Sequence, residues 1–298
     1  MSLPTHFTLN TGAKIPAVGL GTWQSKPGEV RNAVQFALKD GYRHIDAALI
    51  YGNEVEVGQG IRDSGVPRDD IFVTSKLWNT DHPNVAAGLE RSLKNLGLDY
   101  LDLYNKPGEL LPVNPDGTRA VDRSWDMSET WRQMEEVYKA GKVKAIGLAN
   151  WSIPYLEELR KTWTVVPAVN QVELHPFLPQ HALREYCHKL GILIEAYSPL
   201  GSTGAPIASD PVIQQVAQKY AVSPATILIS YHVNRGDVVL PKSVTEARIT
   251  SNRHIIAIAK DDLQLLDGLA AQGKAKRLNT PLWGFDVGFA DWYGPVKS

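Results

Sequence analysis

Three residues in the first third of the chain have side chains that together suit proton transfer. Asp46 and Tyr51 follow one apolar run, and Lys76 stands near the end of the next. A tyrosine hydroxyl has an ordinary pKa of about 10, so it is a weak proton donor at neutral pH. A neighbouring lysine ammonium stabilises the tyrosinate and lowers that pKa, and an aspartate can pair with a buried lysine. The set indicates a Tyr51–Lys76–Asp46 proton relay.

The same residues also fit a purely structural role. In that interpretation Asp46 and Lys76 form an ion pair at the rim of the fold, and Tyr51 caps the helix that follows it. Spacing alone does not choose between a relay and an ion pair, so both interpretations stand at this point.

The elements that must position these residues alternate regularly between short apolar runs and longer amphipathic ones. The expected strands span residues 15–21, 42–48, 71–77, 100–104, 143–150, 166–174, 192–198 and 238–243. Short strands without clean polar alternation are typical of parallel strands buried on both faces. Eight such units predict an α/β fold of the (β/α)₈ TIM-barrel type. The alternative, an open Rossmann-type sheet, is disfavoured because no G-x-G-x-x-G follows the first strand.

The two ends of the chain depart from this alternation. Residues 7–17 predict a short N-terminal β-hairpin whose turn is Thr11-Gly12. From about Lys276 the chain becomes rich in aromatic residues and glycine, which predicts an ordered C-terminal loop over the active site. The total of 298 residues suits one barrel domain spanning 1–298, since such barrels need roughly 250 residues.

Composition excludes several classes of partner. The formal net charge is −1, which favours neither nucleic acid nor an anionic membrane. Cys187 is the single cysteine, so no internal disulfide can form and a reducing compartment is expected. No signal sequence or long apolar run is present, and no clustered His/Cys pattern suggests a metal. We expect a cytoplasmic, monomeric protein that acts on a small molecule.

Six segments resemble signatures of the aldo-keto reductase family. They are GLGTW at 19–23, DAALIYGNE at 46–54, SKLWN at 75–79, NQVELHP at 170–176, AYSPLGS at 196–202 and LPKSVTEAR at 240–248. They occur in the family's order and cover nearly the whole chain, and the tail resembles that of fungal members. The resemblance implies an NADPH-dependent oxidoreductase that reduces small aldehydes or ketones, including sugar-derived aldehydes.

The resemblance also assigns roles to individual residues. It implies that Tyr51 is the general acid, Lys76 lowers the pKa of Tyr51, and Asp46 pairs with Lys76. Asn150 and Gln171 would hold the nicotinamide carboxamide, and Tyr197 would stack on the nicotinamide ring. The implied cofactor-binding set is Gly21, Thr22, Trp23, Asp46, Asn150, Gln171, Tyr197, Ser198, Leu200, Ser202, Lys242, Ser243, Val244, Thr245, Arg248 and Asn252. The expected substrate pocket is lined by Trp23, Tyr51 and Trp78.

The choice of NADPH over NADH also has a basis in the residues themselves. Lys242 and Arg248 stand with serine and threonine at an expected helix start. A 2′-phosphate requires cations and hydroxyl donors, and arginine supplies a two-pronged donor fork. Lysine is slightly unfavourable at a helix N-terminus, which favours an anionic ligand there.

The chain departs from the family at the end of the fourth expected strand. Members normally continue from a DLY-like segment into a histidine followed by Trp-Pro, whereas Tyr104 here is followed by NKPGELLPVNPDG. We interpret this as a short deletion, which predicts that the strand ends early and leaves a wider, wetter site. Losing one such donor typically costs on the order of 10²–10³ in rate. Ala149 also stands where the family commonly has a serine.

Three hypotheses follow from this departure. The protein is a slow or altered reductase, an NADP(H)-binding protein that acts as a sensor or partner subunit, or a splice variant whose deletion is incidental.

Overall fold

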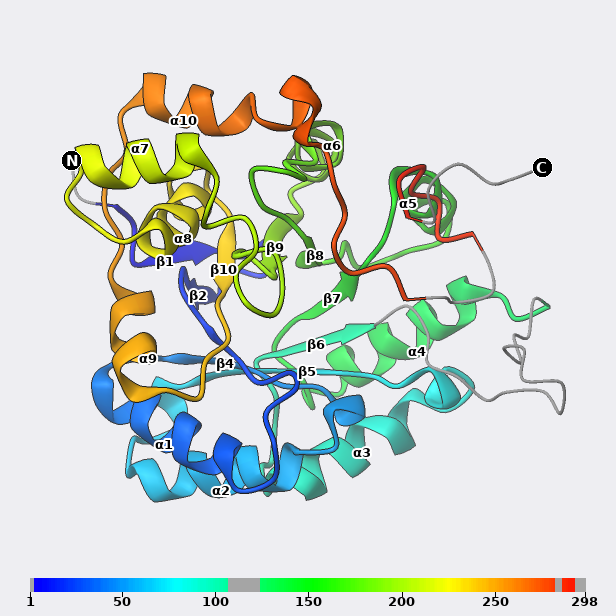
Figure 1. Ribbon diagram of the computed structural model, residues 1–298. Coiled ribbons are helices and arrows are strands. Elements are labelled where there is room, and N and C mark those ends of the chain that lie inside the picture. Colours follow the sequence, from blue (N-terminus) through cyan, green and yellow to red (C-terminus); the bar gives the residue numbers. More distant parts are fainter. Residues whose placement is uncertain (1–2, 107–123, 282–285, 293–298) are drawn as a thin grey trace, which may run out of the picture.

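Eight parallel strands form a closed barrel in the computed structural model, which describes residues 3–106, 124–281 and 286–292. The strands are hydrogen-bonded to one another in chain order from β3 to β10. Parallel bridges from Val18 to Val239 and from Gly21 to Lys242 join the first strand to the last. The predicted (β/α)₈ barrel is therefore confirmed, and helices surround it on the outside (Figure 1).

The strands and helices have the following bounds. The barrel strands are β3 (Leu20–Gly21), β4 (His44–Asp46), β5 (Phe72–Lys76), β6 (Leu103–Lys106), β7 (Ile146–Ala149), β8 (Val169–Glu173), β9 (Leu193–Tyr197) and β10 (Val238–Leu240). The α-helices are α1 (Glu29–Asp40), α2 (Glu54–Ser64), α3 (Val85–Leu96), α4 (Met127–Lys139), α5 (Ile153–Arg160), α6 (His181–Lys189), α7 (Pro211–Lys219), α8 (Pro224–Asn234), α9 (Glu246–Arg253) and α10 (Lys260–Asp267).

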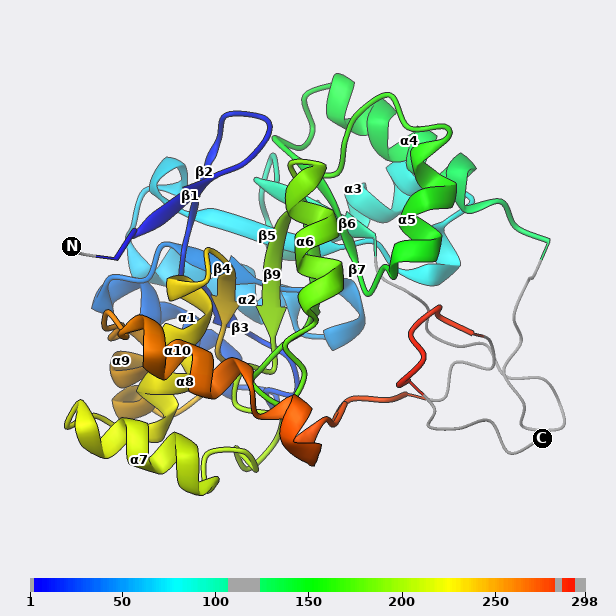
Figure 2. The same ribbon diagram turned by 90° about the horizontal axis from the view of Figure 1, so that it is seen from above.

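The N-terminal hairpin forms as predicted, from β1 (His6–Thr8) and β2 (Lys14–Pro16), with Gly12 in the left-handed conformation at φ 86°. The apolar run 15–21 was expected to be one strand, but that prediction is wrong. Its first residues pair with β1 in the hairpin, and the barrel strand β3 is Leu20–Gly21, preceded by the bridge at Val18. In both views the hairpin and the C-terminal segment lie on different sides of the molecule, as Figure 2 shows.

The helices bury one apolar face against the barrel and against each other. In α3 the Asn84 side chain accepts a hydrogen bond from the Ala87 N–H, and Gly97 ends the helix at φ 66°. The approach of α2 to the end of α3 requires a glycine. A Cβ on Gly58 would lie 1.9 Å from the carbonyl oxygen of Leu96, so only glycine permits this packing.

The fourth barrel strand was expected to end early, after Tyr104, and that prediction is wrong. β6 continues to Lys106, because Asn105 pairs in register with Lys76 of β5 and Lys106 pairs with Leu148 of β7. Asn105 and Lys106 therefore extend the strand where a loop was expected. The predicted outward displacement of the following loop, and the wider site, fall on residues 107–123 and lie outside the described residues.

Candidate active site

Asp46, Tyr51 and Lys76 meet at the carboxyl ends of neighbouring strands. Asp46 ends β4 and Lys76 ends β5, and Tyr51 closes a 3₁₀ turn, η1 (Leu49–Tyr51), that begins just beyond β4. The Lys76 Nζ lies 2.7 Å from each carboxylate oxygen of Asp46, 3.0 Å from the Ala47 carbonyl and 3.3 Å from the Tyr51 hydroxyl. The ammonium therefore joins the carboxylate to the phenol in one cluster.

Burial and neighbouring charges have opposite effects on the pKa values of Tyr51 and Lys76. Burial raises the pKa of Tyr51, and the Lys76 ammonium opposes that rise. Burial also lowers the pKa of Lys76, but Asp46 outweighs it and the net pKa of the ammonium is raised. Lys76 is therefore a permanent cation at neutral pH, which is the form that stabilises a tyrosinate.

A second set of polar groups lies deeper in the barrel. The Gln171 Nε2 on β8 donates to Asp46 Oδ1 at 2.9 Å and to Glu195 Oε2 on β9 at 2.7 Å. Glu195 is fully buried, and the His44 Nε2 lies 3.5 Å from its other oxygen. Burial, followed by repulsion from Asp46, raises the pKa of Glu195 to about 8. Sequence reasoning missed Glu195, although a carboxylate in an otherwise apolar strand was a signal.

The residues assigned to the nicotinamide lie close together. Tyr197 ends β9, and its hydroxyl donates to the Asn150 Oδ1 at 2.9 Å just beyond β7. Asn150 and Ser198 both have positive φ angles, of 59° and 51°. Such strained backbone is uncommon for residues other than glycine and concentrates at functional sites. Together with Gln171 these groups place amide and aromatic surfaces around one opening of the barrel.

Residues of the β3–α1 connection border the relay. The Thr22 hydroxyl donates to the Asp46 carbonyl at 2.8 Å, and the Asn53 amide donates to the Thr22 carbonyl at 3.0 Å. Trp23 is 44% exposed, which is high for so large an apolar side chain. Trp78 is half-buried at the start of the turn η3 (Asn79–Asp81). Both tryptophans are thus available at the rim where a substrate pocket was predicted.

The predicted phosphate-binding residues surround the start of α9. Arg248 donates to the Thr245 hydroxyl at 2.6 Å, and Lys242 donates to the Gln24 carbonyl at 3.4 Å. Neither cation forms an ion pair within the described part of the chain. Partial burial lowers the pKa of Lys242, the Glu29 carboxylate opposes this effect, and the Arg248 cation adds to it. Of the other residues in this set, Ser243 and Asn252 are buried and Val244 is half-buried.

The loop after β9 reaches across to other parts of the rim. The Ser202 hydroxyl donates to the Asn279 side chain at 3.3 Å, and Thr203 donates to the Gln24 side chain at 3.3 Å. Leu200 packs against the hydrophobic core and holds the base of this loop in place. Gly21 pairs with Lys242, so the first and last barrel strands meet beside the same loop.

A buried carboxylate contributes to anchoring the C-terminal segment. Glu173 ends β8 and accepts hydrogen bonds from the backbone N–H groups of Leu278 at 2.7 Å and Asn279 at 2.9 Å. The His175 ring lies 3.0 Å from the same carboxylate. Arg277 packs on Trp292 and pairs with Asp291 at 3.1 Å. Sequence reasoning did not single out Glu173 or Arg277.

The described end of β6 carries no histidine. Asn105 is fully buried in the barrel interior there, and its side chain faces Glu195. It lies against Gly147, where an added Cβ would come within 2.4 Å of the Asn105 oxygen. Asn105 is therefore a buried polar side chain of β6 inside the barrel, and whether it takes the place of a histidine stays open.

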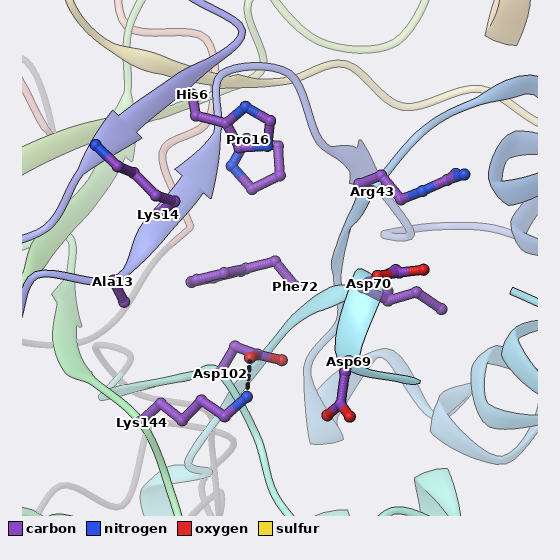
Figure 3. A pocket seen from close by; sticks show the side chains of 11 residues that line it. His6, Ala13, Lys14, Pro16, Arg43, Asp69, Asp70, Phe72, Asp102 and Lys144 are labelled. Carbon is purple, nitrogen blue, oxygen red and sulfur yellow. Dashed lines mark ion pairs between the residues drawn. The ribbon is translucent and has the colours of Figure 1, made fainter. Parts of the chain in front are cut away.

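A second hollow lies at the opposite, amino-terminal end of the barrel. It has a volume of about 410 Å³ and is lined by side chains such as Lys14, Arg43, Phe72, Asp102 and Lys144 (Figure 3). Phe72 begins β5, whereas Lys76 ends it, so this cavity is separated from the relay by the length of the strand. In barrels of this architecture the working face is the carboxyl end of the strands, which this cavity does not reach.

Two negative findings apply to the ranges 3–106, 124–281 and 286–292. No group of three or more histidine, cysteine, aspartate or glutamate side chains is arranged to hold a metal ion. In the same ranges, every helix is too short or too polar to cross a bilayer.

Comparison with known proteins agrees with the fold. The chain matches the Aldo/keto reductase family over residues 17–271. It is 50% identical to D-galacturonate reductase of Hypocrea jecorina, with 96% of this chain and 98% of that protein covered. It is 49% identical to glycerol 2-dehydrogenase (NADP(+)) of Saccharomyces cerevisiae, with 94% and 96% covered. The structure of aldose reductase from Schistosoma japonicum matches it with a TM-score of 0.88 at 33% identity, covering 100% of both chains.

This protein belongs to the aldo-keto reductase family. The resemblance drawn from the six motifs is thereby confirmed. The roles of individual residues, and the interpretation of the segment after Tyr104 as a deletion, stay predictions.

Proposed function

We propose that this protein is an NADPH-dependent reductase of small aldehydes or ketones, including sugar-derived aldehydes. The observation that carries the proposal is the cluster of Tyr51, Lys76 and Asp46, in which the lysine contacts both the carboxylate and the phenol. The names of two relatives support the cofactor and the substrate class, since one is called NADP(+)-dependent and the other acts on D-galacturonate.

The reaction adds a hydride to the carbonyl carbon and a proton to the carbonyl oxygen. Bound NADPH supplies the hydride. Tyr51 donates its hydroxyl proton to the oxygen as negative charge develops there, and the Lys76 ammonium at 3.3 Å stabilises the tyrosinate left behind. Asp46 holds the ammonium in that position. Asn150, Gln171 and Tyr197 are the residues that would orient the nicotinamide, and Lys242 and Arg248 would hold a phosphate.

The fit to a phosphorylated cofactor rests on charge. Lys242 and Arg248 stand near the start of α9 and form no ion pair among the described residues, and partial burial lowers the pKa of Lys242 more than the Glu29 carboxylate raises it. A dianionic 2′-phosphate would supply the missing counter-charge. Gly21, Thr22, Trp23, Ser198, Leu200, Ser202, Ser243, Val244, Thr245 and Asn252 complete the proposed binding surface.

The activity is tested by following NADPH oxidation with a simple aldehyde such as glyceraldehyde. Tyr51→Phe removes one hydroxyl and should lower turnover by at least about 10² while the protein stays folded. Tyr138→Phe is the matched control, because Tyr138 is half-buried on α4, on the outside of the barrel, and should keep the parent rate. A Tyr51→Phe variant as fast as the parent at every pH would disprove the assigned role.

A second candidate function is NADP(H) binding without efficient turnover, as a sensor or partner subunit. It is favoured by the absence of any histidine between His82 and His175 in the sequence. Inserting a family-like segment with His-Trp-Pro after Tyr104 separates the two functions. A rise in turnover with unchanged NADPH affinity indicates a reductase slowed by the loss of one donor, for which about 10²–10³ is typical. A parent protein already at ordinary rates, with no gain on insertion, would show that another group replaces the histidine.

We further propose a single domain over 1–298 and a monomeric, cytoplasmic protein.

A further inference from the structure

A second carboxyl group lies directly behind the relay and shares a ligand with it. The Gln171 Nε2 donates to Glu195 Oε2 at 2.7 Å and to Asp46 Oδ1 at 2.9 Å. Gln171 and Glu195 are register partners on β8 and β9, so their side chains point to the same face, while Asp46 is reached across the barrel. A primary amide nitrogen carries two hydrogens, and here each is bound by one carboxyl group.

This arrangement fixes the orientation of the Gln171 amide. With the nitrogen held between two carboxyl groups, the amide oxygen must point the other way and act as an acceptor. A rotated amide would place its oxygen against the Asp46 carboxylate and lose that hydrogen bond. Asp46 and Glu195 together therefore determine which atom Gln171 presents toward the opening of the barrel.

The charges around Glu195 are unbalanced. Among the described residues, the groups that face it are Asp46 and His44 from β4, Lys76 from β5, Asn105 from β6 and Gln171 from β8. Burial lowers the pKa of His44 to about 3, so this ring is neutral. Lys76 is then the one cation facing two carboxyl groups in this described set. A second buried negative charge without its own partner is costly, so Glu195 holds a proton at neutral pH, in line with its raised pKa.

We propose that Glu195 is a positioning residue of the relay, which locks the Gln171 amide and, by gaining or losing its own proton, sets how readily Tyr51 releases one. The proposal rests on the proposed function of Tyr51 as proton donor. When Glu195 ionises, its negative charge disfavours the neighbouring tyrosinate and keeps Tyr51 protonated to a higher pH. Removing the charge should therefore move the titration of Tyr51 to lower pH.

Two substitutions distinguish the role of Glu195 in orienting the Gln171 amide from the effect of its charge on Tyr51. Glu195→Gln has the same shape and keeps an oxygen that can accept from Gln171, but it cannot ionise. Glu195→Met removes both the charge and the acceptor. Glu135→Gln is the control, since Glu135 is equally buried but lies on α4 and binds the backbone at Thr164 and Val165.

The decisive measurement is the titration of Tyr51 by ¹³C NMR on protein labelled at the tyrosine ζ carbon and saturated with NADP⁺. The Tyr51 signal is the one lost in Tyr51→Phe. We expect its midpoint to fall by about half a pH unit or more in Glu195→Gln and to stay unchanged in Glu135→Gln. This readout needs no turnover, so it remains valid if the protein proves not to be a reductase. An equal midpoint in parent and Glu195→Gln, or no titration in either, overturns the proposal.

Cofactor affinity tests the positioning role independently. The dissociation constant for NADPH should rise at least about tenfold in Glu195→Met, because Gln171 loses its fixed orientation, and should change less than about twofold in Glu195→Gln. If Glu195→Met does not fold, the comparison is made with Glu195→Thr, which also removes the acceptor at that distance. Unchanged affinity in a folded acceptor-free variant overturns this part of the inference.

Discussion

Lys76 and Asp46 form a two-pronged ion pair across adjacent strands, with the ammonium nitrogen 2.7 Å from both carboxylate oxygens. Both side chains are almost fully buried, at 6% and 5% exposure. Each charge needs the other to remain inside the barrel. The ion pair of the structural interpretation is therefore present, and the catalytic relay stays a prediction.

Removing one partner of this ion pair should destabilise the folded protein. We expect Lys76→Met to lower the free energy of unfolding at pH 7 by about 3–5 kcal/mol, because Asp46 is left as an uncompensated buried charge. Urea denaturation of the parent protein and the variant measures this loss.

The double variant Lys76→Met/Asp46→Asn provides the internal check on that stability prediction. It should be more stable than Lys76→Met alone, since no buried charge is left. Lys161→Met, which breaks an exposed pair with Glu158, should cost less than about 1 kcal/mol. A Lys76→Met protein as stable as the Lys161→Met control would contradict the prediction.

The preference for NADPH should depend on Arg248. Arg248→Ala is expected to weaken NADPH binding at least about tenfold, since charge-assisted hydrogen bonds contribute about 1.5–3 kcal/mol, and to leave NADH binding nearly unchanged. Quenching of tryptophan fluorescence measures both affinities. Arg253→Ala is the matched control on the same helix, because Arg253 already pairs with Asp40. Equal affinity of the parent for both cofactors would refute the assignment.

The C-terminal segment should be released when its anchor is weakened. Glu173→Gln removes the charge that accepts from the Leu278 and Asn279 backbone and contacts His175. We expect trypsin to cleave after Lys274 and Lys276 about tenfold faster, because local opening governs such cleavage. Gel electrophoresis of timed digests follows the reaction.

The control for the proteolysis experiment is Glu185→Gln, a surface carboxylate paired with Lys189. It should be digested at the parent rate. Cleavage of Glu173→Gln at that same rate would mean that other contacts, such as the Arg277–Asp291 pair, suffice to hold the segment.

The parts of this molecule that the sequence predicted are those with local signals. Strand and helix order followed from the alternation of apolar and amphipathic runs, and the meeting of Asp46, Tyr51 and Lys76 followed from their positions near strand ends. The division of residues 15–21 between hairpin and barrel was missed, because one apolar run satisfies either partner. The extension of β6 through Asn105 was missed because polar residues rarely continue a buried strand.

Glu195 and Glu173 show what a single sequence leaves hidden. Both lie in strands buried on two faces, where no alternation reveals which side chains point inward. Groups that act on them, the Asp46 charge on the first and the Leu278 N–H on the second, are far away along the chain. Such contacts follow from closure of the barrel and not from spacing, so only the folded chain brings them together.

The barrel closes at a seam where its first strand meets its last, and we expect this seam to be less stable locally than the other strand pairs. β3 holds only Leu20–Gly21, and the closure to β10 depends on the bridges at Val18 and Gly21. Lys242 and Thr22, on opposite sides of this joint, both belong to the proposed cofactor surface. A dinucleotide that contacts both residues would stabilise the closure of the barrel. Without the cofactor, we expect local opening to begin at this seam. Amide exchange in β3 and β10 would then slow more on cofactor binding than exchange in β6 or β7.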